Sequence, residues 1–452
     1  MSREAKDLRR ILFRDGFNYF LSKVIPGLMG FLSVLIFVRL LGVEQYGRYA
    51  MIFALVMAWA SGLSGWLSQG VLRFQSQWHH PDDSENFFRS TMLGMLLSAI
   101  AGFVFLGIAM PALGIEKGWS LFVPLALLCG LIAYTVAIGR LQASLQSRKV
   151  LWLEISRAVL CLLIPVSFVA LAGLRDYRLL LFGIAAGYSL PLASWFLFRQ
   201  RPRSKNAGEL FGKPSVESRR VLSEVWQFGW PVAVWLLCQQ GLLVSDRYFL
   251  QRFFGYADAG VYASMYDVIV RSFSLLFMPV TLAIHPLVMN FWNSGKRAEA
   301  LRAIYTGVLY QLLLFVPIAA GLFFLSPLMT RMVLGRQSPV ASALALPLTV
   351  GGFLWQVCLL SHKPLELLCQ TKRMLVGISL ALAINIGGNW LLVPRYGYRA
   401  SAYLTIASAT AYLLMLLILT PLEDLRRSAA LGTAAPEPIH CNSAEPVTTS
   451  PS

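Results

Sequence analysis

Long runs of apolar residues recur along this chain, with short polar segments between them. A helix of about 20 apolar residues crosses the hydrocarbon core of a bilayer, which is about 30 Å thick. Strands of a membrane barrel alternate between apolar and polar positions, a pattern that these runs lack. We therefore predict about twelve transmembrane helices, at Phe20–Leu41, Tyr46–Leu67, Thr91–Leu113, Trp119–Leu141, Leu153–Gly173, Leu179–Phe198, Phe228–Leu250, Gly260–Ile284, Tyr305–Leu325, Ala343–Leu360, Leu375–Val393 and Ala400–Thr420.

The composition supports the same interpretation. Hydrophobic residues make up 57% of the 452 residues, charged residues make up 13%, and the mean hydropathy is +0.62. Soluble domains carry about 25% charged residues, so this chain is too apolar to cover a water-facing surface of ordinary size. We predict an all-α membrane protein.

The formal net charge of +17 raises the question of nucleic-acid binding, so the positions of the basic residues matter. They concentrate before the first predicted span and in the loops that follow even-numbered spans. Positively charged loops stay on the cytoplasmic side, which predicts that both termini are cytoplasmic. Because no basic patch with interleaved aromatic residues lies outside the spans, we expect no nucleic-acid partner.

The longest predicted loop divides the chain into two parts. Residues 199–227 are rich in basic residues and follow the sixth span. We interpret them as a basic cytoplasmic linker between two six-helix lobes, at residues 1–198 and 228–425. Residues 426–452 are rich in Ala, Pro, Ser and Thr, so we predict a disordered cytoplasmic tail.

The two predicted lobes share a sequence pattern. Arg39–Ala50 in the first and Arg252–Ala263 in the second both read R-x-x-G-x-x-x-x-G-x-Y-A, at an offset of 213 positions. Each copy lies between the first and second helix of its lobe. Internal repeats of this kind are typical of transporters. We assign the glycines to sharp turns and the Arg and Tyr residues to headgroup depth, which is a structural role.

Charged residues inside the apolar spans are the candidate site residues, because an ionised group in hydrocarbon is unfavourable unless it is paired or faces water. Arg271 is eleven residues into the eighth span, about 16 Å deep and close to the midplane. Asp267, one helical turn away, is expected to neutralise it, while Asp246 and Arg247 on the seventh span add a second pair. One interpretation is a cationic cavity for an anionic head group, with carboxylates that couple transport to protons or sodium. The alternative is a charged network that only fixes helix packing.

Three more charged residues lie close to the ends of spans. Lys23 is near the inner end of the first span, and Glu154 and Arg157 open the fifth. Long side chains at such positions reach the headgroups while their stems stay in the apolar region, so we expect these three to snorkel.

Several activities are disfavoured by what the sequence lacks. It has no Walker A motif, so ATP hydrolysis cannot be assigned to it. The six cysteines show neither metal-ligand nor disulfide spacing, and we expect no metal and no cofactor. A membrane glycosyltransferase would be expected to carry a sizeable outer domain, and every predicted outer loop is short. We therefore predict a transporter, not an enzyme.

Three stretches resemble one family of transporters. Phe37–Gly47 resembles the first hairpin of the polysaccharide biosynthesis (Wzx-type) flippases, which belong to the multidrug/oligosaccharidyl-lipid/polysaccharide exporter superfamily. Ser245–Arg247 with Gly260–Tyr262 is similar to the seventh-span motif of that family, and Gln370–Arg373 through Leu392–Gly397 is similar to its eleventh-span region.

This resemblance implies two six-helix lobes around a central cavity, in a bacterial inner (plasma) membrane. It implies a flippase that moves a polyprenyl-diphosphate-linked oligosaccharide from the cytoplasmic to the outer leaflet, for O-antigen, capsule or exopolysaccharide biosynthesis. The candidate substrate-binding residues are then Lys23, Arg247 and Arg271, and the candidate ion-coupling residues are Asp246 and Asp267. Membrane lipids and other polysaccharide-assembly proteins are the further candidate partners. The alternatives are a cation-coupled multidrug antiporter of the same superfamily and, less favoured, a membrane glycosyltransferase.

Overall fold

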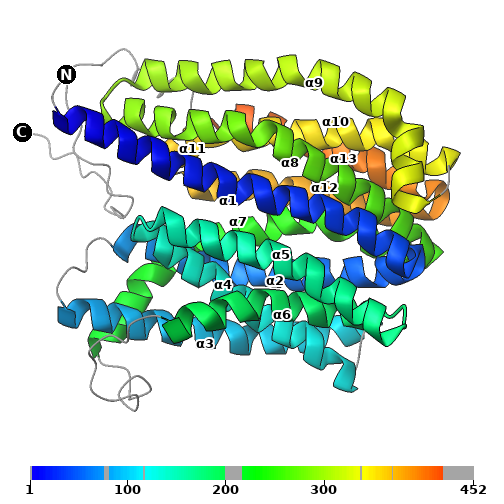
Figure 1. The fold of residues 1–452 in the computed structure, drawn as a ribbon. Helices are drawn as coiled ribbons and strands as arrows, with labels where there is room; N and C mark the ends of the chain where they lie inside the picture. Colours follow the sequence, from blue (N-terminus) through cyan, green and yellow to red (C-terminus); the bar gives the residue numbers. More distant parts are fainter. Residues whose placement is uncertain are drawn as a thin grey trace, which may run out of the picture.

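The computed structural model describes residues 3–75, 81–115, 118–198, 216–335, 338–368 and 370–420. These residues form helices and short connections, without any strand (Figure 1). The helices are α1 (Arg3–Leu41), α2 (Val43–Phe74), α3 (Pro81–Ala112), η2 (Gly118–Leu121), α4 (Phe122–Ala143), α5 (Ser147–Ala172), α6 (Tyr177–Phe198), α7 (Val216–Phe254), α8 (Tyr256–Asn293), α9 (Arg297–Leu334), α10 (Pro339–Ser361), α11 (Lys363–Leu367), α12 (Thr371–Tyr396) and α13 (Tyr398–Leu419).

The predicted all-α membrane fold is confirmed for the described part of the chain. Ten of its helical segments are long and apolar enough to cross a membrane, and they lie on α1–α5, α7, α9, α10, α12 and α13. The sixth and eighth predicted spans lie on α6 and α8, which are not among these ten. The number twelve therefore stays a prediction.

The start of α7 differs from the sequence prediction. The linker was expected to extend to residue 227, but α7 begins at Val216, so its last residues are helical. Val221 and Val225, one helical turn apart, pack against Trp66 and Val71 of α2. An apolar stripe along the charged first turns of α7 explains why the helix begins earlier than predicted. The stripe buries one face of the helix, but the segment is not apolar enough to be recognised as a span. Residues 199–215 and 426–452 lie outside the described residues.

Helix α1 lies between two groups of helices. It packs against α5 on one side and α8 on the other, and Figure 1 shows it crossing between α8–α10 and α2–α6. Within the groups, α5 packs against α6, α2 against α4, α8 against α9, and α12 against α13. The groups also meet directly, because α2 packs against both α7 and α8.

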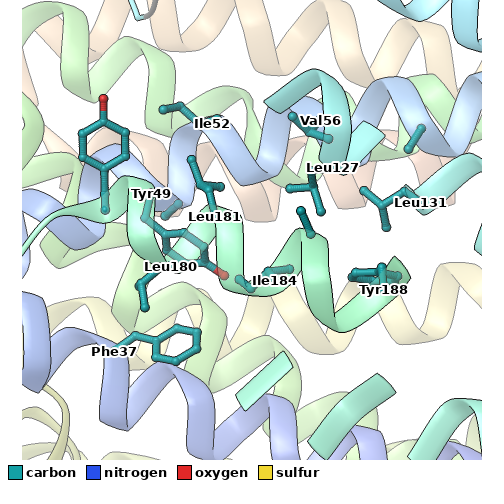
Figure 2. Close-up of a cluster of buried hydrophobic side chains, with 14 of the residues drawn as sticks. Phe37, Tyr49, Ile52, Val56, Leu127, Leu131, Leu180, Leu181, Ile184 and Tyr188 are labelled. Atoms are coloured by element: carbon teal, nitrogen blue, oxygen red, sulfur yellow. The ribbon is translucent and has the colours of Figure 1, made fainter. Parts of the chain in front are cut away.

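The core of the first group consists of closely packed side chains from α1, α2, α4 and α6 (Figure 2). Phe37 packs edge-to-face on Tyr49, with ring centroids 5.8 Å apart, and Leu127 and Leu180 are fully buried in the same cluster. Lipid tails are as apolar as these residues, so shape and close packing, not exclusion from water, hold such helices together. This core fixes α1 and α2, which carry part of the candidate site.

The repeated sequence pattern forms a reciprocal contact between the two groups. Gly42 and Gly255 turn the chain with φ values of 82° and 90°, which favour glycine. Five residues after each turn, Gly47 of α2 lies against Gly260 of α8. A Cβ at Gly47 would overlap the carbonyl oxygen of Tyr256, and a Cβ at Gly260 would overlap that of Val43, which is the equivalent position 213 residues earlier.

Candidate functional site

Arg271 lies where α8 meets α1. Its guanidinium fills the space beside Gly30, where a side chain of any size would collide with it. Arg271 is partly exposed, and among the described residues no carboxylate lies within ion-pair distance of it. A glycine on α1 therefore creates room for an unpaired cation between the two groups of helices.

The ion pair predicted between Asp267 and Arg271 is wrong. Asp267 pairs instead with Arg247, which reaches it from α7, and the hydroxyl of Tyr46 on α2 donates a 2.9 Å hydrogen bond to the other carboxylate oxygen. The Arg247 side chain is only 6% exposed, and its Nε has no hydrogen-bond partner among the described residues. Asp267 thus neutralises Arg247 and leaves Arg271 without a counter-ion in the described part of the chain.

Asp246 does not pair with its neighbour in sequence. Adjacent residues on a helix point in different directions. Asp246 contacts α12 and α13 as well as α8. It accepts hydrogen bonds from Tyr262 at 2.6 Å, Asn389 at 2.8 Å and Thr405 at 3.1 Å, and its side chain is 1% exposed. The described residues around it provide only neutral hydrogen-bond donors. Asp246 is a buried carboxylate held by polar groups from three helices.

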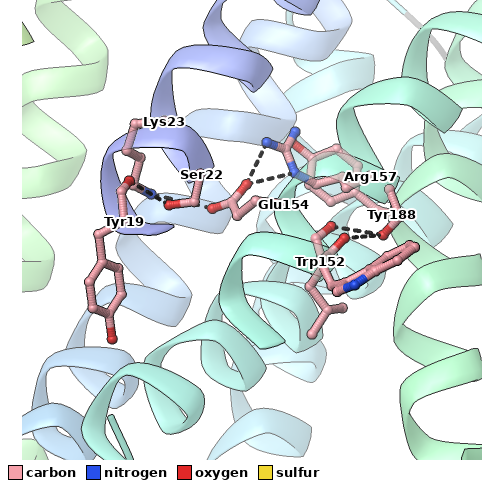
Figure 3. A network of polar contacts seen from close by, with 9 residues as sticks. Tyr19, Ser22, Lys23, Trp152, Glu154, Arg157 and Tyr188 are labelled. Carbon is pink, nitrogen blue, oxygen red and sulfur yellow. Dashed lines mark hydrogen bonds and ion pairs between the residues drawn. The ribbon is translucent and has the colours of Figure 1, made fainter. Parts of the chain in front are cut away.

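A second charged network lies at the α1–α5 contact (Figure 3). Glu154 of α5 divides its two oxygens between two cations: Lys23 of α1 is 3.3 Å from Oε1, and Arg157 is 2.7 Å from Oε2. Arg157 also donates to the Tyr188 hydroxyl at 3.3 Å and lies over the rings of Tyr188 and Tyr134. The network contains two cations and one anion, so it carries an excess of one positive charge.

The predicted snorkelling of Glu154 and Arg157 is therefore wrong. Glu154 is 6% exposed, and the Arg157 side chain is 18% exposed. Their partners explain the difference, because ion pairs and aromatic rings supplied by α1, α4 and α6 replace the headgroup water that each would otherwise need. Lys23 alone remains accessible, with a side chain that is 40% exposed.

The predicted site residues thus separate into three places. Arg271 and the Arg247–Asp267 pair lie where α7 and α8 meet α1 and α2. Lys23 lies on α1 about 10 Å along the helix from Gly30, because seven residues separate the two positions. Asp246 lies within the second group of helices. Two substrate candidates, Lys23 and Arg271, are near α1, whereas Arg247 is beside α8 and α2 and the two ion-coupling candidates are in different surroundings.

Two hollows in the described residues lie away from α1. A small, partly open pocket of about 30 Å³ is lined by α7, α8, α10 and α13, near Tyr266 and Trp355. An open hollow of about 870 Å³ lies at the hairpin between α12 and α13, near Arg395 and Arg399. Neither is lined by α1, and the central cavity between two lobes that the resemblance implies stays a prediction.

The sequence interpretation missed the neutral residues of the site. Asn385 and Asn389 are fully buried on α12, and the Ser401 hydroxyl donates to Asn389 at 2.7 Å. Two asparagines one helical turn apart inside an apolar span are a signal that could have been used, because amides in hydrocarbon need partners. Gly30 and Tyr46 gave no such signal, since their roles depend on which helix they face.

The fold is shared with solved transporters. The structure matches an inward-facing multidrug resistance MATE family transporter of the MOP superfamily with a TM-score of 0.69 and 13% identity, covering 92% of this chain and 99% of that one. It matches the lipid II flippase MurJ in an inward closed conformation with a TM-score of 0.66 and 14% identity, covering 93% and 90%. A MOP superfamily transporter from Pyrococcus furiosus, for which reversed polarity of the binding pocket suggests a different function, gives a TM-score of 0.58 and 14% identity over 94% and 96%.

Comparison of the sequence itself gives the family. No curated protein matches the chain. The model of a family described as polysaccharide biosynthesis protein matches residues 12–292, which is more than half of the chain and includes α1–α8 almost completely. The protein therefore belongs to the polysaccharide biosynthesis protein family.

Proposed function

We propose that this protein is a flippase that moves a polyprenyl-diphosphate-linked oligosaccharide from the cytoplasmic to the outer leaflet, for the synthesis of a surface polysaccharide. The unpaired Arg271 at the contact between α8 and α1 is the observation that carries the proposal. A guanidinium without a counter-ion among the described residues is unfavourable at this depth, so an anionic ligand that reaches it would stabilise it. A diphosphate is the anionic part of a lipid-linked sugar and matches the planar donors of arginine.

Lys23 and Arg247 complete the proposed head-group site. Lys23 keeps an accessible ammonium on the same helix that borders Arg271, and Arg247 has a buried Nε without a partner. A diphosphate between the lobes would contact Arg271 first, because the charge of Arg247 is already balanced by Asp267. The central cavity that such a ligand needs forms, in this proposal, when α1 and α8 separate.

Asp246 is the proposed ion-coupling residue, and Asp267 takes part through Arg247. A buried carboxylate surrounded by neutral donors is stabilised by taking up a proton or a small cation such as sodium. The ion would therefore bind away from the head-group site, and the helices α7 and α8 would connect the two. In this proposal an ion gradient drives transport across a bacterial inner membrane, and both termini lie in the cytoplasm.

A cation-coupled multidrug antiporter is the competing function, because MATE transporters share the fold. An antiporter for cationic compounds needs an uncompensated carboxylate at the contact between the lobes. Of the described residues there, Arg271 carries an uncompensated charge, and Asp267 is bound by Arg247 and Tyr46. The sign of the charge favours an anionic substrate.

The test is transport by purified protein in liposomes that contain a defined polyprenyl-diphosphate-linked sugar, with and without proton and sodium gradients. The wild type is expected to move the lipid-linked sugar, and Arg271→Ala is expected to abolish transport while Arg271→Lys keeps part of it. Gly387→Ala on α12 is the matched control, because a side chain there meets nothing within 4 Å. Transport of cationic compounds but not of the lipid-linked sugar would reject the proposal.

A further inference from the structure

The Lys23–Glu154–Arg157 network has an uneven arrangement of partners around Glu154. Arg157 is held firmly: its Nε and Nη2 both donate to Oε2, at 3.2 Å and 2.7 Å, and two tyrosine rings enclose its guanidinium. Lys23 makes a single contact, at 3.3 Å, from a side chain that is 40% exposed. Of the two cations, Lys23 is the one that can exchange its partner.

Glu154 is positioned to compete with a ligand for that cation. Among the described residues, Glu154 is the carboxylate that pairs with Lys23. Glu154 contacts α1 from α5, whereas Arg271 contacts α1 from α8. An anion bound between α1 and α8 therefore attracts the Lys23 ammonium away from Glu154. The carboxylate that Lys23 leaves keeps Arg157 as its partner, so no buried charge is left unpaired.

We infer that Glu154 is an internal competitor of the substrate: it binds Lys23 while the carrier is empty, yields it to the diphosphate, and recovers it when the diphosphate leaves. The inference rests on the proposed function and adds a positioning residue to it. Glu154 acts through Lys23 and touches no substrate. It sets how tightly the head group is held, and thereby how quickly it is released.

The summed charge of these site residues indicates which class of anionic substrate competes with Glu154 for Lys23. The Lys23–Glu154–Arg157 network contributes one positive charge, Arg271 contributes another, and the Arg247–Asp267 pair contributes none. A diphosphate diester carries two negative charges at neutral pH, whereas a monophosphate diester carries one. The excess of two matches the diphosphate, and removing the negative charge of Glu154 would leave three.

Glu154→Gln separates this role from a purely structural one. The variant is expected to bind the head group about tenfold more tightly, because a positive charge near the ligand is no longer offset. Its maximal transport rate is expected to fall, because no internal anion recovers Lys23. A residue that only holds α5 against α1 would weaken binding or lower the amount of folded protein, but it would not tighten binding.

The experiment compares wild type, Glu154→Gln and Glu154→Asp in detergent and in liposomes. Binding is measured with two radiolabelled probes, farnesyl-diphosphate-N-acetylglucosamine and farnesyl-phosphate-N-acetylglucosamine, and transport is followed against probe concentration. Glu154→Asp keeps the charge on α5 and the nearby Arg157, so it is expected to show near wild-type binding of both probes. Glu154→Gln is expected to lower the half-saturating concentration of the diphosphate probe by about tenfold and to reduce the maximal rate.

The outcomes separate the two proposals. Failure of the wild type to bind or move the diphosphate probe would contradict the proposed function itself. If the wild type transports the probe but Glu154→Gln binds it with unchanged or weaker affinity, the competitor role of Glu154 is wrong. If Glu154→Gln does not fold, the Asp variant decides: a loss of folding there too would make Glu154 purely structural and overturn the inference, whereas a folded Asp variant with near wild-type binding and the same preference for the diphosphate probe supports it.

Discussion

The glycine contact between α2 and α8 gives the sharpest test of how the two groups of helices separate. Gly47 and Gly260 occupy equivalent positions of the repeat, and each leaves no room for a Cβ against the backbone of the facing helix. Backbone cannot rotate away as a flexible side chain can. A methyl group at either position must therefore push the ends of α2 and α8 apart, and we predict that Gly47→Ala and Gly260→Ala shift the protein towards a state in which these ends are separated.

The size of this shift follows from the cost of overpacking. Forcing an extra methyl group into a close contact costs about 1–3 kcal/mol, and about 1.4 kcal/mol changes an equilibrium tenfold. Each variant should therefore raise the ratio of separated to closed protein by roughly five- to 150-fold. The double variant should add much less than the sum of both, because the two methyl groups act on one contact and the second meets ends that have already parted.

Distances between spin labels measure this equilibrium directly. Trp119, 97% exposed on η2, and Tyr396, 66% exposed at the end of α12, can each be replaced by cysteine in a background without the six native cysteines. Both positions lie on connections at the same end of the bundle as the glycine turns. Gly107→Ala on α3 is the control, because nothing lies within 4 Å of a Cβ there. Distance distributions that are identical in wild type, Gly47→Ala and Gly260→Ala would refute the reasoning.

Three further predictions concern the charged residues. Arg247→Ala should destabilise the protein by about 3–5 kcal/mol, because it leaves Asp267 without its cation, and the Arg247→Ala/Asp267→Ala double variant should recover much of the loss in a thermal unfolding measurement. Asp246→Asn should abolish the dependence of transport on an ion gradient while head-group binding persists, and equal stimulation of this variant by the gradient would contradict the coupling role. Tyr46→Phe removes one hydrogen bond to Asp267 and should cost about 1.5–3 kcal/mol in the same unfolding measurement.

The helices were predictable from the sequence because the hydrocarbon core of a membrane restricts the structures that can cross it. Each span must satisfy its own backbone, so a continuous apolar run is enough to identify it. The first helical turns of α7 escaped this rule, since Val221 and Val225 are buried against α2 by an amphipathic face and not by lipid. Such a face predicts a helix but does not show which helix it covers.

The partners of the charges could not be predicted in the same way. Spacing along one helix placed Asp267 within reach of Arg271, yet Arg247 on the facing helix is its partner. Glu154 provides the same lesson, because Lys23 reaches it from α1 across a contact between distant segments. Position within a span shows that a charge needs a partner, but only the packing of helices decides which one it finds.

The repeat is present in both halves of the chain, whereas the charged site residues are not repeated. This difference bears on what the protein carries. The glycine turns are duplicated at an offset of 213 positions, and the single contact of α2 with α8 joins equivalent residues of the two copies. The same offset relates Arg271 to Ala58 and Asp267 to Ala54, both of which are buried alanines on α2. The frame is therefore symmetric, whereas the charges next to it belong to one side. A symmetric frame suits two groups of helices that must part and close again. A charge on one side suits a ligand with a single anionic group, which is the chemistry of a sugar joined to a lipid through phosphate.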